Sequence, residues 1–143
     1  MDTSDLRKRI LRALDDARKD ATARRQVVDA AAAAYQEFLA NTAAPLVRQA
    51  VTVLRAEGHS FTANTPAGSV RLASDASPQT FLEFELDVAG QQPQVIGRVS
   101  VTRGRQGVVV EERPIAPGKS LTDLADDDVA KFLVTEIPKL VVK

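Results

Sequence analysis

His59 is the chain's single histidine and the first side chain that could do acid–base chemistry. A catalytic histidine needs an orienting carboxylate and a nucleophile beside it, and the sequence around Gly58-His59 supplies neither. The chain has no Cys, which excludes a thiolate nucleophile and a Cys-based zinc site. The phosphate-loop, dinucleotide-binding and nucleophile-elbow motifs are absent as well. We therefore predict no catalytic residue, no cofactor and no enzymatic activity.

The densest group of carboxylates is Asp123 together with Asp126-Asp127-Asp128. A divalent cation needs several oxygen ligands at fixed spacing, whereas adjacent Asp residues on a helix point in different directions. Negative charge is favoured at a helix N-terminus. We interpret these residues as the start of a helix and predict no metal site.

Two arginines, Arg103 and Arg105, flank a glycine at a predicted hairpin tip. They are candidates for phosphate contact, and the first helix adds basic residues to this alternative. Residues 1–40, however, hold eight basic and seven acidic side chains, and nonspecific nucleic-acid affinity needs several uncompensated phosphate contacts. We keep nucleic-acid binding as an alternative function.

A row of alternating charge is predicted across three strands by Glu85, Arg98 and Glu111. If Gly104-Arg105 is a two-residue turn, Arg98 pairs with Glu111 and Val99 with Val110. Placing Phe84 opposite Val99 then pairs Glu85 with Arg98. This register directs Val108 and Val110 inward. We interpret the charged row as register-fixing pairs on a solvated face.

The 143 residues carry 19 basic and 19 acidic side chains, with 44% hydrophobic residues. This composition is typical of one globular protein. No stretch of about 18 or more apolar residues is present, and charges interrupt the first 16 residues too often for a signal peptide. We expect a cytoplasmic protein without membrane contact.

All seven Pro and all seven Gly lie from Pro45 onward. This shift divides the chain into residues 1–44, an extension or dimerisation element, and residues 45–143, an α+β domain. The Ala-rich first part predicts a helix from about Ser4 to Leu39. At about 1.5 Å per residue it is longer than a domain of this size needs.

An apolar ridge follows one face of this helix at spacings of mostly three and four, interrupted by Arg24. We predict that a second copy or a protein partner covers it. The predicted interaction residues are Leu6, Ile10, Leu14, Val28 and Tyr35.

The rest of the chain predicts an α+β fold of order α-α-β-β-β-β-β-α. A second helix after Pro45 ends at Gly58, with a break or kink over residues 41–45. Period-two patterning from His59 to Ile115 predicts a five-stranded antiparallel meander. A C-terminal helix follows, which Pro138 is expected to end or kink. We expect the second and C-terminal helices to cover one sheet face.

The leading functional hypothesis is a non-catalytic interaction or assembly module that self-associates through the N-terminal helix. A small apolar-ligand binder is a further alternative, with a cavity between sheet and helices. Its predicted lining residues are Phe61, Phe81, Phe84 and Phe132.

Overall fold

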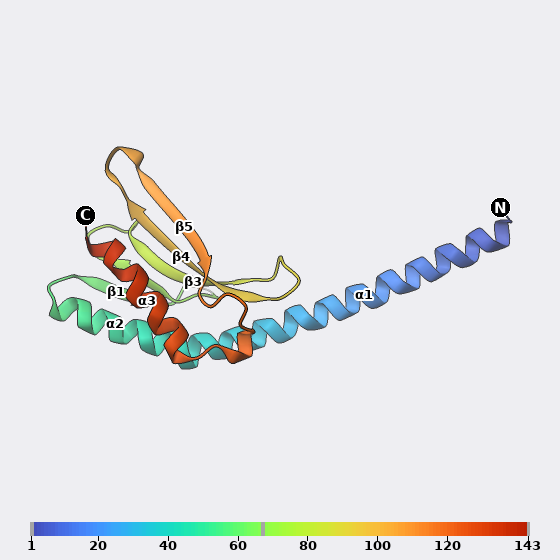
Figure 1. Ribbon diagram of the computed structural model, residues 1–143, viewed down its shortest axis with the longest axis horizontal. Helices are drawn as coiled ribbons and strands as arrows, with labels where there is room; N and C mark the ends of the chain where they lie inside the picture. Colours follow the sequence, from blue (N-terminus) through green and yellow to red (C-terminus); the bar gives the residue numbers. More distant parts are fainter. Residues whose placement is uncertain (1, 67, 143) are drawn as a thin grey trace.

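Two helices run end to end at the start of the chain (Figure 1). In the computed structural model, which describes residues 2–66 and 68–142, α1 spans Thr3–Phe38 and α2 spans Ala44–Ala56. The Asp2 carboxylate caps α1 by accepting a hydrogen bond from the Ser4 N–H at 3.3 Å, which satisfies one of the unpaired donors of the first turn. The predicted long N-terminal helix is confirmed.

The junction between the two helices is a single wide π-helical turn, η1 (Leu39–Ala43). Pro45 has no N–H and its ring crowds the carbonyl four residues earlier. The wider turn accommodates this, and the Ala44 N–H donates to the Leu39 carbonyl five residues back. The predicted break is therefore a local widening, and the chain stays helical through it.

The end of α2 is closed by Gly58 and by the backbone of His59. Gly58 adopts φ 88°, a left-handed conformation that favours glycine. The Gly58 N–H donates to the Arg55 carbonyl at 3.1 Å, and the His59 N–H donates to the Leu54 carbonyl at 2.8 Å. These two bonds form a Schellman motif, which ends a helix by satisfying its last carbonyls.

The sheet is a five-stranded antiparallel meander in which each strand pairs with the next along the chain. This order confirms the predicted topology. The strands are β1 (Phe61–Asn64), β2 (Arg71–Ser74), β3 (Phe81–Asp87), β4 (Gln94–Thr102) and β5 (Val108–Pro114).

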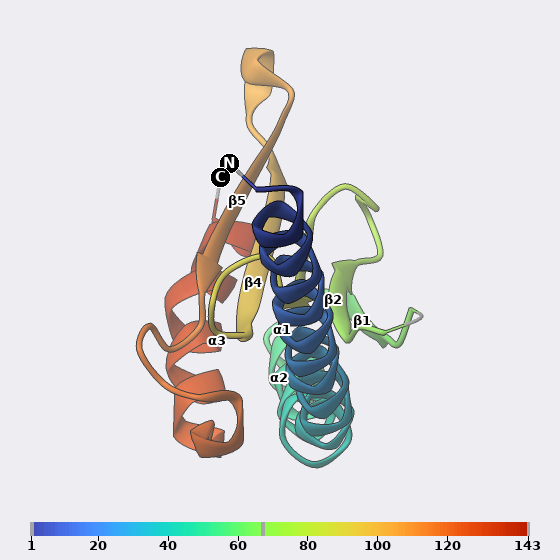
Figure 2. The same cartoon turned by 90° about the vertical axis from the view of Figure 1, so that its right-hand side faces the viewer.

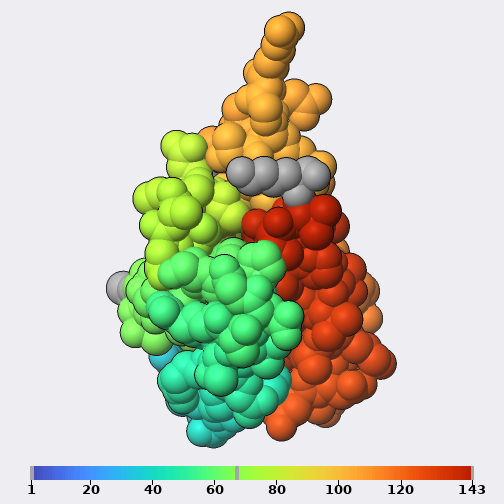
Figure 3. Space-filling view, turned by 90° about the vertical axis from the view of Figure 1, so that its left-hand side faces the viewer, coloured from blue at the N-terminus to red at the C-terminus, as the bar shows by residue number. Residues whose placement is uncertain are grey.

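One face of the sheet is covered by helices, as predicted. The C-terminal helix α3 (Asp126–Val141) lies beside α2 against this face (Figures 2 and 3). Pro138 lies inside α3, where the sequence predicted a helix end or a kink. The core is centred on Phe84, whose ring lies 6.1 Å from the ring of Phe38 and 5.7 Å from that of Phe132.

The register between β4 and β5 differs from the prediction by one residue. Val99 pairs with Glu111 and Arg98 with Glu112, because the connection is a longer turn containing a 3-10 segment, η2 (Gly104–Gln106). A shift of one residue exchanges the two faces of a strand. Val108 and Val110, predicted to point inward, are consequently 44% and 52% exposed.

The register between β3 and β4 differs by two residues. Phe84 pairs with Gly97 rather than with Val99. A Cβ at position 97 would overlap the Phe132 ring, so glycine is the residue that lets α3 pack its aromatic side chain onto the sheet. The predicted pairing of Phe84 with Val99 leaves no such opening.

The uncovered face of the sheet carries an ion-pair network centred on Arg98. Its guanidinium lies 3.1 Å from a Glu83 oxygen, 2.8 Å from Glu85 and 2.8 Å from Glu112. The Arg71 guanidinium forms an ion pair with the other carboxylate oxygen of Glu83 at 2.8 Å. The predicted contact of Arg98 with Glu85 is present, whereas Glu112 takes the place of Glu111.

Candidate interaction surface

The ridge predicted along α1 is divided between the protein's own core and solvent. Leu6, Ile10 and Leu14 are 48%, 49% and 46% exposed. Val28 is half-buried and Tyr35 is buried. One continuous helix face therefore meets the domain at its C-terminal end and nothing at its N-terminal end.

Tyr35 belongs to the core and is not available to a partner. Its hydroxyl donates to the Phe84 carbonyl at 2.9 Å, and its ring stacks on Phe38 with centroids 6.3 Å apart. Burial, together with the nearby negative charges of Glu85 and Glu83, raises the pKa of the Tyr35 hydroxyl well above its ordinary value. Tyr35 thereby anchors the last turns of α1 to β3.

Arg24 marks the point where the covered and uncovered parts of the ridge meet. Its guanidinium donates to the carbonyl of Val88, which follows β3. Sequence alone identified Arg24 only as a polar residue at an apolar position. The structure shows that its long side chain reaches the adjoining loop instead of a packed core.

Residues 3–27 form what we call the exposed arm. Every residue in this range is exposed, and the arm extends away from the rest of the molecule (Figure 1). Helices gain most of their stability in proteins from packing of an apolar face. The exposed arm has such a face and no covering within the described chain.

The side chains of the apolar ridge are large at one end of the exposed arm and small at the other. Leu6, Ile10 and Leu14 lie at its N-terminal end, and Ala17 and Ala21 continue the same face toward the domain. The ridge therefore projects further from the helix axis at its N-terminal end than near the domain.

The charge of the exposed arm differs from that of the whole chain. Residues 3–27 contain eight Lys or Arg and four Asp, a net charge of +4, whereas the full chain is neutral. Lys19 pairs with Asp15 at 3.1 Å, one turn away. The remaining basic excess is solvated.

Arg103 and Arg105, the predicted phosphate contacts, take different positions. Arg105 lies in the exposed turn η2. Arg103 directly follows β4, at the start of the same turn, and lines a cleft together with Lys139 of α3. No sequence pattern places Lys139 there, because the two residues lie on separate elements far apart in the chain.

The other candidates for chemistry are explained by local structure. The His59 side chain is exposed, and its backbone N–H closes α2. A hydrogen bond from the Ala125 N–H and another from Lys119 lower the pKa of the Asp128 carboxyl. Within residues 2–66 and 68–142, no group of three or more potential ligand side chains is arranged to hold a metal ion.

Across the same two ranges, none of the helices combines the length and apolar character needed to cross a bilayer. Comparison of the chain with protein-family models, curated proteins and solved structures finds no match.

Proposed function

We propose that the protein is a non-catalytic assembly module that self-associates by antiparallel pairing of two exposed arms. The observation that carries this proposal is the ridge itself. The helix face that buries Tyr35 and Ala31 continues toward the N-terminus through the exposed arm. There it carries Leu6, Ile10 and Leu14, which nothing in the described chain covers. Burial of such side chains contributes about 1.5–3 kcal/mol each.

The position of the domain favours the antiparallel orientation. The domain occupies the same face of α1 as the ridge, at the C-terminal end of the helix. In a parallel pair, two domains would compete for the space at one end. In an antiparallel pair, each domain lies beyond the N-terminus of the other arm.

The change in side-chain size along the ridge supports the same orientation. Antiparallel overlap brings Leu6 opposite Ala21 and Ile10 opposite Ala17 of the second copy. Large side chains then pack over small ones, which is how helices approach closely without voids. In a parallel overlap, Leu6 would meet Leu6 and Ala17 would meet Ala17, so the spacing between the helices would vary along the pair.

The net charge of +4 on each arm sets the expected salt dependence. Like charges on two arms repel, and salt screens exposed charges within a Debye length of about 8 Å at physiological ionic strength. Self-association is therefore expected to strengthen or stay constant as salt rises. Nucleic-acid binding, the alternative that a basic arm supports, weakens steeply with salt.

Sedimentation equilibrium of the full chain tests the proposal. We expect dimers that dissociate in the double variant Leu6→Gln, Ile10→Gln. Glutamine keeps a high helix propensity, so loss of the dimer reports on the ridge and not on helix formation.

The matched control is the double variant Val53→Gln, Val134→Gln, which replaces two exposed apolar residues on α2 and α3. It should dimerise like the unaltered protein. A strict monomer at all micromolar concentrations would overturn the proposal. A dimer that survives in the ridge variant would show that another surface is used.

A further inference from the structure

We propose that the cleft beside Arg103 binds a small organic carboxylate with an apolar chain. The cleft has a volume of about 580 Å³ and lies between the end of β4 and the last turns of α3. This volume falls within the range of about 300–1,000 Å³ that is typical of small-molecule sites. The site is separate from the exposed arm and does not rest on the assembly role.

The cleft has an apolar wall made by two elements. Val101 comes from β4, and Leu140 and Val142 come from α3. Val101 is buried, whereas Leu140 is half-buried and Val142 is exposed. An alkyl chain laid along this wall would cover apolar surface that now faces solvent.

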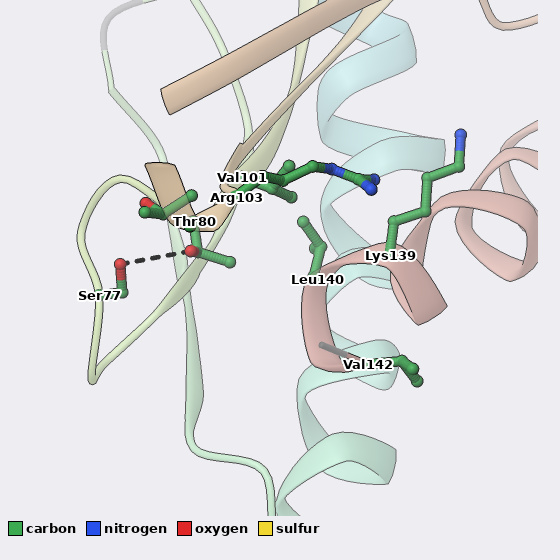
Figure 4. Close-up of a pocket in the computed structure, with 9 residues that line it drawn as sticks. Ser77, Thr80, Val101, Arg103, Lys139, Leu140 and Val142 are labelled. Carbon is green, nitrogen blue, oxygen red and sulfur yellow. Dashed lines mark hydrogen bonds between the residues drawn. The ribbon is translucent and has the colours of Figure 1, made fainter. Parts of the chain in front are cut away.

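A cationic side chain, that of Arg103, lines the same cleft. The side chains of Arg103 and Lys139 both extend past Leu140 toward the same side of the cleft (Figure 4). Among the nine residues drawn in Figure 4, the marked hydrogen bond joins Thr80 and Ser77 at 3.3 Å, and none involves the Arg103 guanidinium. Arg103 is therefore available to an anion, with hydroxyl groups on the opposite wall.

The charges around the cleft favour a monoanion. Lys139 is already engaged, with its ammonium 2.9 Å from Glu136 and 3.6 Å from Glu111. Within residues 2–66 and 68–142, no ion pair engages the Arg103 guanidinium, and its planar fork matches a carboxylate. A phosphate dianion would lie near two carboxylates and near the negative end of the α3 dipole.

This site is not the cavity that the phenylalanines of the sequence suggested. Phe84 and Phe132 fill the interface between sheet and helices, and the Phe81 ring lies under the Arg71 guanidinium at 4.1 Å. The nine lining residues of the cleft include neither these three rings nor Phe61.

Titration calorimetry with decanoate below its micelle concentration tests the site. We expect saturable binding of decanoate and much weaker binding of acetate, which lacks the chain, and of decanol, which lacks the charge. Arg103→Gln should weaken decanoate binding about tenfold or more, since it removes a charge-assisted contact, and should leave decanol binding unchanged.

Arg105→Gln is the matched control, because it removes the same charge from the same turn at a position outside the cleft lining. It should bind decanoate like the unaltered protein. Amide chemical shifts should move at residues 101–103 and 139–142. Equal affinity in Arg103→Gln, no binding to the unaltered protein, or shifts confined to the exposed arm would each overturn the proposal.

Discussion

The Phe132 ring of α3 lies directly on the backbone of Gly97 in β4, where any Cβ would overlap the ring. Gly97 pairs with Phe84 on one side and with Arg113 on the other. The Arg113 guanidinium covers the Phe132 ring at 4.6 Å and pairs with Glu136 at 2.8 Å. One glycine therefore fixes where α3 meets the sheet and how its neighbours pack.

Gly97→Ala is expected to destabilise the fold by about 1–3 kcal/mol, the usual cost of forcing an extra carbon into a packed core. Urea unfolding followed by circular dichroism measures this change. Gly90→Ala is the control, because a Cβ there would meet only the Gln92 carbonyl oxygen at 3.9 Å. A Gly97→Ala protein as stable as the control would show that Phe132 can shift without loss.

The same glycine shows where sequence reasoning succeeds and where it fails. Alternation along β3 and β4 predicted two antiparallel strands with the correct inward side chains, such as Leu82 and Val99. The register depends on the conformation of the turns and on a contact between Gly97 and Phe132. That contact joins residues 35 positions apart, and no local pattern encodes it.

A second prediction concerns the shared acceptor at Phe84. Its carbonyl receives the Tyr35 hydroxyl at 2.9 Å and the Ser69 hydroxyl at 2.7 Å. Tyr35→Phe or Ser69→Ala alone should each cost about 0.5–1.5 kcal/mol, because one donor remains. The double variant should cost more than the sum, since a polar group left without donors bears its full desolvation penalty.

Thermal or urea unfolding of the four proteins forms the double-mutant cycle that measures this coupling. A strictly additive double variant would show that water replaces the lost donors at the Phe84 carbonyl.

The predicted interaction surface was also only partly accessible to sequence reasoning. Leu6 and Tyr35 lie on one stripe of one helix, and nothing in their spacing distinguishes the solvent-exposed part from the part inside the core. The sequence shows Arg24 only as a polar residue at an apolar position, and the structure places it at the boundary, where its guanidinium donates to the Val88 carbonyl.

A third prediction follows from the buried carboxyl of Glu136. Burial pushes the pKa of Glu136 upward, but hydrogen bonds and charges from Lys139 and Arg113 outweigh it, so the pKa lies below its ordinary value. A lowered pKa stabilises the fold above the carboxyl's unfolded pKa of about 4.3 and loses this contribution as the pH falls. Glu136→Gln should therefore destabilise the protein by about 1–3 kcal/mol at pH 7.

The difference between Glu136→Gln and the unaltered protein should be smaller at an acidic pH than at pH 7, because the stability that comes from a lowered pKa is lost as the pH falls through it. Urea unfolding of the two proteins at both pH values measures this difference in the free energy of unfolding. Glu57→Gln, at an exposed position after α2, should show little difference at either pH. If Glu136→Gln lowers the free energy of unfolding equally at both pH values, Glu136 stabilises the fold by packing and not by its charge.

The proposed antiparallel orientation of two exposed arms can be tested by cross-linking, because the chain contains no Cys. A disulfide requires Cα atoms within about 7 Å of each other. In the proposed antiparallel pair, Leu6 would lie opposite Ala21 of the second copy, so Leu6→Cys, Ala21→Cys should form covalent dimers on mild oxidation. Leu6→Cys alone should not, since its two copies lie at opposite ends of the overlap. Non-reducing electrophoresis measures the covalent dimer, and efficient cross-linking of Leu6→Cys alone would show parallel arms.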